Sequence, residues 1–291
     1  MYLDEIFGLK GKVAVVTGGS RGIGQVVAEG LARAGAEVVI LSRSQADETL
    51  QKISDAGGCG YFIKTDVTVE ESVKQAFQVI MERSGSVDIV FNNAGVCLHK
   101  DTLEATVEEF RQVVDVNLTG EYIVARAAGK IMIENDIHGS IINMASMSGS
   151  IVNIPQWQCS YNASKAAVIH MTRSLAVEWA DHHIRVNSLS PGYIATPMSV
   201  DTPKELKDAW MPLIPMHRMG KPEELVPAVL YLAGNASGYT SGSDVVVDDP
   251  ANGRIAIFEA KYTKELDDFH FPTNSLPIKQ MFIFCRREME D

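Results

Sequence analysis

The stretch Val13-Ala-Val-Val-Thr-Gly-Gly-Ser-Arg-Gly-Ile-Gly24 decides the fold of this chain. Its first five residues are small, apolar or β-branched, which predicts a strand buried on both faces. Glycines follow at Gly18, Gly22 and Gly24, and an apolar helical pattern starts there. Glycine accepts positive φ, and a helix N-terminus offers free N–H groups to an anion. The stretch therefore predicts a turn that binds a dinucleotide pyrophosphate, with a tight turn that binds nothing as the alternative.

Strand and helix patterns alternate along the rest of the chain. A long helix is expected over residues 107–134 and another from Tyr161 to about Ala180. This alternation predicts an α/β fold with one Rossmann-type domain, in which helices cover both faces of a doubly wound parallel sheet. The further strands are expected at Glu37–Ser42, Tyr61–Lys64, Val87–Phe91, Ser140–Met144, Arg185–Leu189 and a last one near Val245.

The residues after the second strand indicate which dinucleotide is bound. NAD-binding folds usually place an acidic residue there to hold the ribose 2′-hydroxyl. This chain has Ser42 and Arg43 instead, and Arg21 lies inside the glycine turn. Arginine matches the geometry of a phosphate with a forked donor. We therefore predict NADP(H), with two solvated surface arginines as the alternative.

Two polar residues follow later strands of the predicted sheet. Asp66 comes after the third strand and Asn93 after the fourth. Ligands of open parallel sheets bind beyond the carboxyl ends of the strands, which makes both residues candidates for the adenine and ribose side. Loop capping is the alternative for both, because Asn and Asp favour turns.

Tyr161 and Lys165 form the predicted catalytic pair. Residues four apart on a helix lie on the same face, and a nearby ammonium favours the phenolate form of tyrosine. Together with a cationic nicotinamide, Lys165 is expected to bring the pKa of Tyr161 into working range. Ser146, at the end of the fifth strand, would align a carbonyl oxygen with the phenol, and Ser148 is a competing candidate.

In these elements the chain resembles the short-chain dehydrogenase/reductase family over roughly residues 8–248. The segment from Ala145 to Lys165 most resembles fungal NADPH-dependent sorbose reductases and mannitol dehydrogenases. The matching elements are T-G-x-x-x-G-x-G at residues 17–24, N-N-A-G at 92–95, Asn117, Ser146, Tyr161 with Lys165, and Pro191-Gly192 with Thr196.

The resemblance implies a role for each matching residue. Tyr161 would donate the proton, Ser146 would orient the substrate, and Lys165 would bind the nicotinamide ribose. Asn117 would hold a water that links Lys165 to solvent, and residues 198–218 would form a substrate lid. The backbone near Ile194 and the hydroxyl of Thr196 would hold the carboxamide. The full predicted cofactor set is Gly18, Arg21, Gly22, Ile23, Gly24, Ser42, Arg43, Asp66, Asn93, Tyr161, Lys165, Ile194 and Thr196.

The predicted activity is an NADPH-dependent interconversion of a ketone and a secondary alcohol. Two substrate classes stay open. Ser148, Asn153, Gln156 and Gln158 suit a ketose or polyol, whereas the methionines and Trp210 of the lid suit an apolar ketone from secondary metabolism. A non-catalytic NADP(H)-binding sensor or assembly subunit is the alternative function.

The composition and net charge argue against some classes of binding partner. The net charge of −11 argues against nucleic acid and an anionic membrane as partners. The sequence shows no signal peptide, membrane span or metal pattern, and its four cysteines have no paired spacing, so we expect a cytoplasmic enzyme with reduced thiols.

We assign residues 1–250 to the catalytic domain and 251–291 to an atypical C-terminal extension, expected to be loosely packed or disordered. Asp248-Asp-Pro250 replaces the glycines that the resemblance implies at an interface. The resemblance implies a homo-oligomer, and the changed end predicts a dimer or a weakened tetramer.

Overall fold

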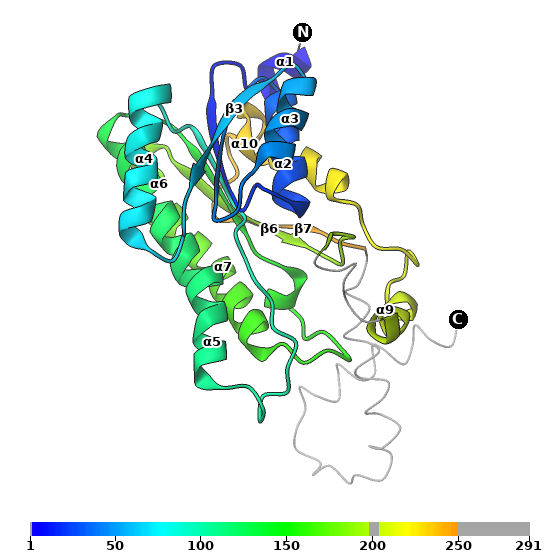
Figure 1. Cartoon of the computed structure of the whole chain (residues 1–291). Helices are drawn as coiled ribbons and strands as arrows, with labels where there is room; N and C mark the ends of the chain where they lie inside the picture. Colours follow the sequence, from blue (N-terminus) through cyan, green and yellow to red (C-terminus); the bar gives the residue numbers. More distant parts are fainter. Residues whose placement is uncertain (1, 198–203, 250–291) are drawn as a thin grey trace, which may run out of the picture.

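A computed structural model gives the structure of this chain and describes residues 2–197 and 204–249. These residues form a seven-stranded sheet in the order β3-β2-β1-β4-β5-β6-β7, in which every neighbouring pair is parallel (Figure 1). The predicted doubly wound sheet is confirmed, with some strand ends displaced by one or two residues. The strands are β1 Val13–Thr17, β2 Glu37–Ser42, β3 Cys59–Lys64, β4 Ile89–Asn92, β5 Ser140–Met144, β6 Arg185–Pro191 and β7 Asp244–Val247.

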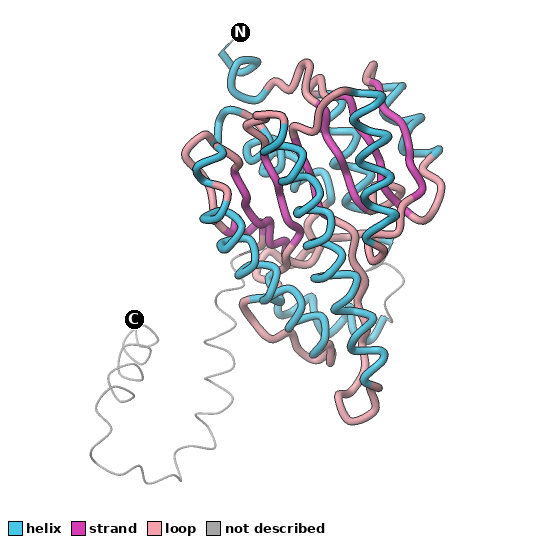
Figure 2. The backbone as a smooth tube through the Cα atoms, turned by 90° about the vertical axis from the view of Figure 1, so that its left-hand side faces the viewer, coloured by secondary structure: helices cyan, strands magenta, loops and turns pink. Residues whose placement is uncertain are grey.

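Helices cover both faces of the sheet, as Figure 2 shows. Successive residues of β1 alternate between two apolar cores, with Val13 and Val15 in one and Ala14 and Val16 in the other. One core includes residues of α2 Gly22–Arg33, α3 Asp47–Asp55 and α10 Val226–Ala233. The other includes residues of α4 Glu70–Ser84, α6 Glu121–Glu134 and α7 Cys159–Glu178. The shorter helices α1 Tyr2–Phe7 and α9 Lys204–Trp210 lie outside these layers (Figure 1).

The helix expected over residues 107–134 is divided into three parts. α5 Val107–Val114 begins at a capping box, where Thr106 accepts a hydrogen bond from the Glu109 amide. A π-helical segment, Asp115–Gly120, then separates α5 from α6. π-helical turns are rare and were not considered in the sequence analysis, which treated α5 and α6 as one helix. The segment carries Asn117, a predicted site residue.

The carboxyl ends of β1, β4 and β5 lie side by side, because these strands are neighbours in the parallel sheet. The glycine turn follows β1, Asn93 follows β4, and Ser146 follows β5. The fold therefore brings the separate sequence motifs to one edge of the sheet. In the part of the chain that the structure describes, no helix has the length and apolarity to cross a bilayer.

Gly24 offers a test of how tightly this edge is packed. A Cβ at this residue would lie 2.5 Å from the Gly18 carbonyl oxygen and 2.6 Å from Nδ2 of Asn93. We expect Gly24→Ala to lower the free energy of unfolding by about 1–3 kcal/mol in a denaturant titration, because the turn and the helix must move apart. Gly238→Ala is the control, since the nearest heavy atom to its added Cβ would be 3.4 Å away. Equal effects of the two substitutions would contradict this packing argument.

Candidate functional site

A cleft of about 260 Å³ opens at the carboxyl edge of the sheet. Gly18 and Gly22 have φ values of 64° and 59°, which glycine adopts without strain. The structure thus brings together most of the predicted cofactor residues, whereas Gly24 and Ile194 do not line this cleft. The predicted residues that do line it are Gly18, Arg21, Gly22, Ile23, Ser42, Arg43, Asp66, Asn93, Tyr161, Lys165 and Thr196.

Asn93 holds the glycine turn in place. Its side-chain amide donates to the Thr17 carbonyl at 3.0 Å, and its backbone N–H donates to the Thr17 hydroxyl at 2.8 Å. Asp66 caps its own loop, because its carboxylate accepts hydrogen bonds from the backbone and hydroxyl of Thr68. The turn-capping interpretation therefore describes the hydrogen bonds of both residues, although both also line the cleft.

The residues of the cleft fit a dinucleotide. α2 begins at Gly22, within the glycine turn, and the first N–H groups of a helix have no partner inside the helix. Arg21 at its N-cap makes no side-chain capping bond with described residues. These N–H groups suit a pyrophosphate. Arg21 and Arg43 are exposed side chains on the lining of the same cleft. Their positive charge suits a phosphate, and attraction to Arg43 is among the effects that lower the pKa of Asp66, after its hydrogen bond with Thr68.

A second cavity, of about 180 Å³, adjoins the first. The two share Ile23, Met144, Tyr161 and Thr196, so Tyr161 stands between them. Ile194 and Ser146 line the second cavity and not the cleft. A molecule in this cavity would face both the phenol of Tyr161 and whatever fills the cleft.

Ser146 and Tyr161 interact directly. Ser146 is 8% exposed; burial raises the pKa of the Tyr161 phenol, and a hydrogen bond with the Ser146 side chain is one of the smaller effects that oppose this rise. The competing candidate, Ser148, instead donates its hydroxyl proton to Oδ1 of Asn153 at 2.5 Å. The geometry therefore favours Ser146 over Ser148 as the partner of the tyrosine.

Two opposing effects act on the pKa of the Tyr161 phenol in the chain without cofactor. Burial raises the pKa of the phenol, and this effect exceeds the lowering by Lys165, whose Nζ lies 5.9 Å from the ring centroid. Desolvation disfavours the charged phenolate. The sequence-based expectation also includes a cationic nicotinamide beside the phenol, so it stays a prediction.

Lys165 has a partner that the sequence analysis missed. Its Nζ lies 3.1 Å from Oε1 of Glu121 and also donates to the Met144 carbonyl. The ammonium and the carboxylate are 2% and 1% exposed. The sequence could have indicated this buried acid, because Glu121 begins α6 on the helix face that carries the apolar residues Val124 and Ala128.

Asn117 links three segments of the chain through side-chain hydrogen bonds, an arrangement that we call the clamp. Its side chain accepts from the Val96 amide and donates to the Val96 carbonyl, both at 2.8 Å, and donates to the Ser164 hydroxyl at 3.2 Å. The residue is fully buried. It therefore ties the loop after β4 to the π-helical segment and to α7, which carries Tyr161 and Lys165.

One wall of the second cavity is polar and buried. Gln158 donates to Ser148, Asn153 and Asn162, at 2.9–3.2 Å. Gln156 donates to the Tyr193 hydroxyl at 2.9 Å and accepts from the Trp210 indole at 2.7 Å. We call Ser148, Asn153, Gln156, Gln158 and Tyr193 the polar wall; all five line the cavity.

The described part of the predicted lid closes over this wall. Trp210 is 3% exposed and stacks on Tyr193 with ring centroids 4.7 Å apart. Asp249, where the resemblance implies glycine, accepts a hydrogen bond from the Met216 amide at 3.0 Å. Residues 198–203 of the lid, Pro250 and the predicted extension 251–291 lie outside the described residues.

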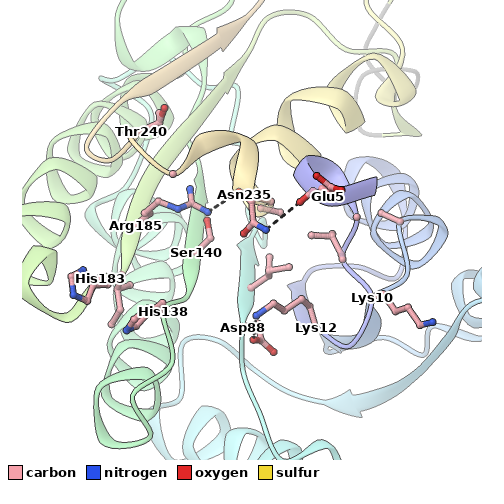
Figure 3. A pocket seen from close by; sticks show the side chains of 18 of the residues that line it. Glu5, Lys10, Lys12, Asp88, His138, Ser140, His183, Arg185, Asn235 and Thr240 are labelled. Carbon is pink, nitrogen blue, oxygen red and sulfur yellow. Dashed lines mark hydrogen bonds and ion pairs between the residues drawn. The ribbon is translucent and has the colours of Figure 1, made fainter. Parts of the chain in front are cut away.

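A larger cavity, of about 1570 Å³, lies at the opposite end of the sheet (Figure 3). Its polar groups pair with each other: Lys12 with Asp88 at 2.9 Å, Asn235 with the Glu5 carbonyl at 3.3 Å, and Arg185 with Ser237 at 2.6 Å. These contacts fasten the N-terminal segment and the loop after α10. None of the predicted site residues lines this cavity.

Comparison with known proteins gives consistent similarities. Residues 18–249 match the family described as enoyl-(acyl carrier protein) reductase. The chain is 46% identical over 248 residues to a probable NADP-dependent mannitol dehydrogenase of Yarrowia lipolytica, covering 84% of this chain and 88% of the relative. It is 45% identical over 249 residues to a sorbose reductase of Candida albicans, with the same coverage.

A solved structure is similar as well. The crystal structure of a short-chain type dehydrogenase/reductase from Mycobacterium marinum matches with a TM-score of 0.80 and 42% identity. The match covers 85% of this chain and 98% of the other. At this similarity the two chains share their fold.

The clamp made by Asn117 can be tested through stability. We expect Asn117→Ala to lower the free energy of unfolding by about 1–3 kcal/mol, because the amide and carbonyl of Val96 lose buried hydrogen bonds. Denaturant unfolding measures the change. Asn135→Ala, which removes an exposed side chain that bonds the Ile131 carbonyl, should have a much smaller effect. A change no larger than that of Asn135→Ala would rule out the clamp.

Proposed function

The chain belongs to the short-chain dehydrogenase/reductase family, and on that premise we propose that it uses NADP(H) to interconvert a ketose and a polyol. Membership makes it an oxidoreductase acting on an alcohol or a ketone. The observation that carries the finer proposal is the position of Tyr161, between a cleft that fits a dinucleotide and a cavity with a polar wall.

The nicotinamide, when bound, supplies the hydride for reduction and accepts it in oxidation. In reduction, Tyr161 gives its phenolic proton to the carbonyl oxygen of the substrate. Ser146 donates a hydrogen bond to the same oxygen, and the Lys165 ammonium stabilises the phenolate that remains. A positioned acid of this kind contributes roughly 10²–10⁴ in rate. In oxidation the phenolate takes the hydroxyl proton back.

The cofactor preference rests on charge. Arg21 and Arg43 lie on the cleft where a ribose 2′-phosphate is expected, and the buried end of β2 provides Ser42 where a carboxylate would repel that phosphate. The relatives named above include a probable NADP-dependent enzyme. Both observations support NADP(H) over NAD(H).

The substrate class rests on the polar wall. Buried hydroxyl and amide groups favour a substrate with several hydroxyls and reject an analogue that lacks them. The names of the two relatives, mannitol dehydrogenase and sorbose reductase, point the same way. A ketose or its polyol is therefore the substrate class that the cavity fits best.

The role of Tyr161 is tested by substitution. NADPH oxidation is followed with sorbose, other ketoses and small apolar ketones, using the wild type and Tyr161→Phe. We expect the variant to bind NADPH by fluorescence and to lose at least about 10² in kcat, because the ring remains but the acid is removed. Full turnover by the variant would contradict the mechanism. A wild type that binds NADPH and reduces no ketone would instead support the non-catalytic alternative.

The role of Arg43 is tested by cofactor affinity. We expect Arg43→Ala to weaken NADPH binding by about ten- to a hundredfold and NADH binding much less, because a charged hydrogen bond contributes roughly 1.5–3 kcal/mol. Fluorescence titration with both cofactors measures the difference. Arg33→Ala, at the far end of α2, is the control. Equal losses for both cofactors, or a wild type that prefers NADH, would refute the assignment.

A further inference from the structure

Glu121 is a buried acid beside the reacting groups. One carboxylate oxygen, Oε1, pairs with Lys165, while Oε2 has no hydrogen-bond partner among the described residues. Burying a charged group is costly, and an apolar residue would fit the inward face of α6 at lower cost. The contact with Lys165 therefore needs an explanation beyond packing.

The electrostatic surroundings of Glu121 are simple. α7 presents Lys165 and Tyr161, and the loop after β4 presents Cys97 close to both. The Glu70–Arg126 pair between α4 and α6 is exposed, at 67% and 60% of the side-chain surface, and so is screened by solvent. Lys165 is the charged group that acts on Glu121 most directly.

We propose that Glu121 is a positioning residue that keeps the Tyr161–Lys165 pair protonated, by placing a buried negative charge against the Lys165 ammonium. This inference rests on the proposed function, because the pair then supplies the proton for reduction. A negative charge a few ångströms away favours the form of the pair that carries more protons. Without it, the pair loses a proton at lower pH.

Removing the negative charge of Glu121 is expected to lower the pH at which the pair loses a proton. Tyr161 and Lys165 interact strongly, so the pH of that loss belongs to the pair as a whole. After burial and Cys97, Glu121 is among the groups that raise the pKa of the Tyr161 phenol, so removing its negative charge lowers the proton affinity of the phenol. Reduction needs the fully protonated pair, so its rate should fall at lower pH once Glu121 is neutralised.

The pKa of Glu121 determines the pH above which its negative charge is present. Burial raises the pKa of this carboxyl to about 8, against the lowering by Lys165. Glu121 is therefore largely neutral below that pH and becomes an anion as the pH rises through it. Above about pH 8 this anion opposes loss of a proton from the pair, and so it extends reduction toward higher pH.

The pH profile of ketose reduction tests the inference. We expect Glu121→Gln to move the basic limb of kcat to lower pH by about one unit or more, which is about a tenfold lower rate on that limb. Glu134→Gln, an exposed acid at the end of the same helix, should leave the limb where it is in the wild type. If Glu121→Gln fails to fold, Glu121→Met removes the charge with an apolar side chain.

A second measurement does not need turnover. Calorimetry of NADP⁺ binding, in buffers of different ionisation enthalpy, counts the protons released by the protein at each pH. We expect the neutral variant to release them at lower pH than the wild type. An unshifted kinetic limb or unshifted proton release would overturn the role of Glu121. A shifted release in a protein that reduces no ketose would support Glu121 and overturn the proposed function instead.

Discussion

The buried ammonium of Lys165 is the constraint on which the arrangement of the site depends. A cation that is 2% exposed needs partners, and it finds them on separate elements: Glu121 at the start of α6 and the Met144 carbonyl at the end of β5. Its own helix, α7, carries Tyr161 one turn earlier. These contacts fix the distance between the tyrosine and the sheet edge, and so the position of the acid relative to the cleft.

The glycine turn and the tyrosine–lysine pair can be predicted from sequence because each is a local pattern. The glycines need only their own backbone conformation and the helix that follows, and the two catalytic candidates need only helical spacing. The parallel order of the strands then follows from the alternation of strands and helices. This explains why residues far apart in the chain, such as Gly18 and Tyr161, were correctly expected at one edge.

The parts that sequence did not reveal depend on tertiary contacts. The π-helical segment was not predicted, yet it holds Asn117 against the backbone of Val96, which lies in the loop after β4. The partner of Lys165 was missed for the same reason. Glu121 lies 44 residues from Lys165, and only the packing of α6 against the sheet brings the two together. Whether Tyr161 titrates low or high likewise depends on burial, which no motif records.

The polar wall adds a physical argument about selectivity. Its hydroxyl, amide and phenol groups already bond to each other, so a substrate hydroxyl must replace one of these bonds to enter. A polyhydroxylated molecule offers a donor and an acceptor for each bond it breaks, and the exchange costs little. An apolar ketone offers neither, and would leave buried groups without partners. The proposed preference for a ketose or polyol over an apolar ketone therefore rests on the same network that stabilises the wall in the free protein.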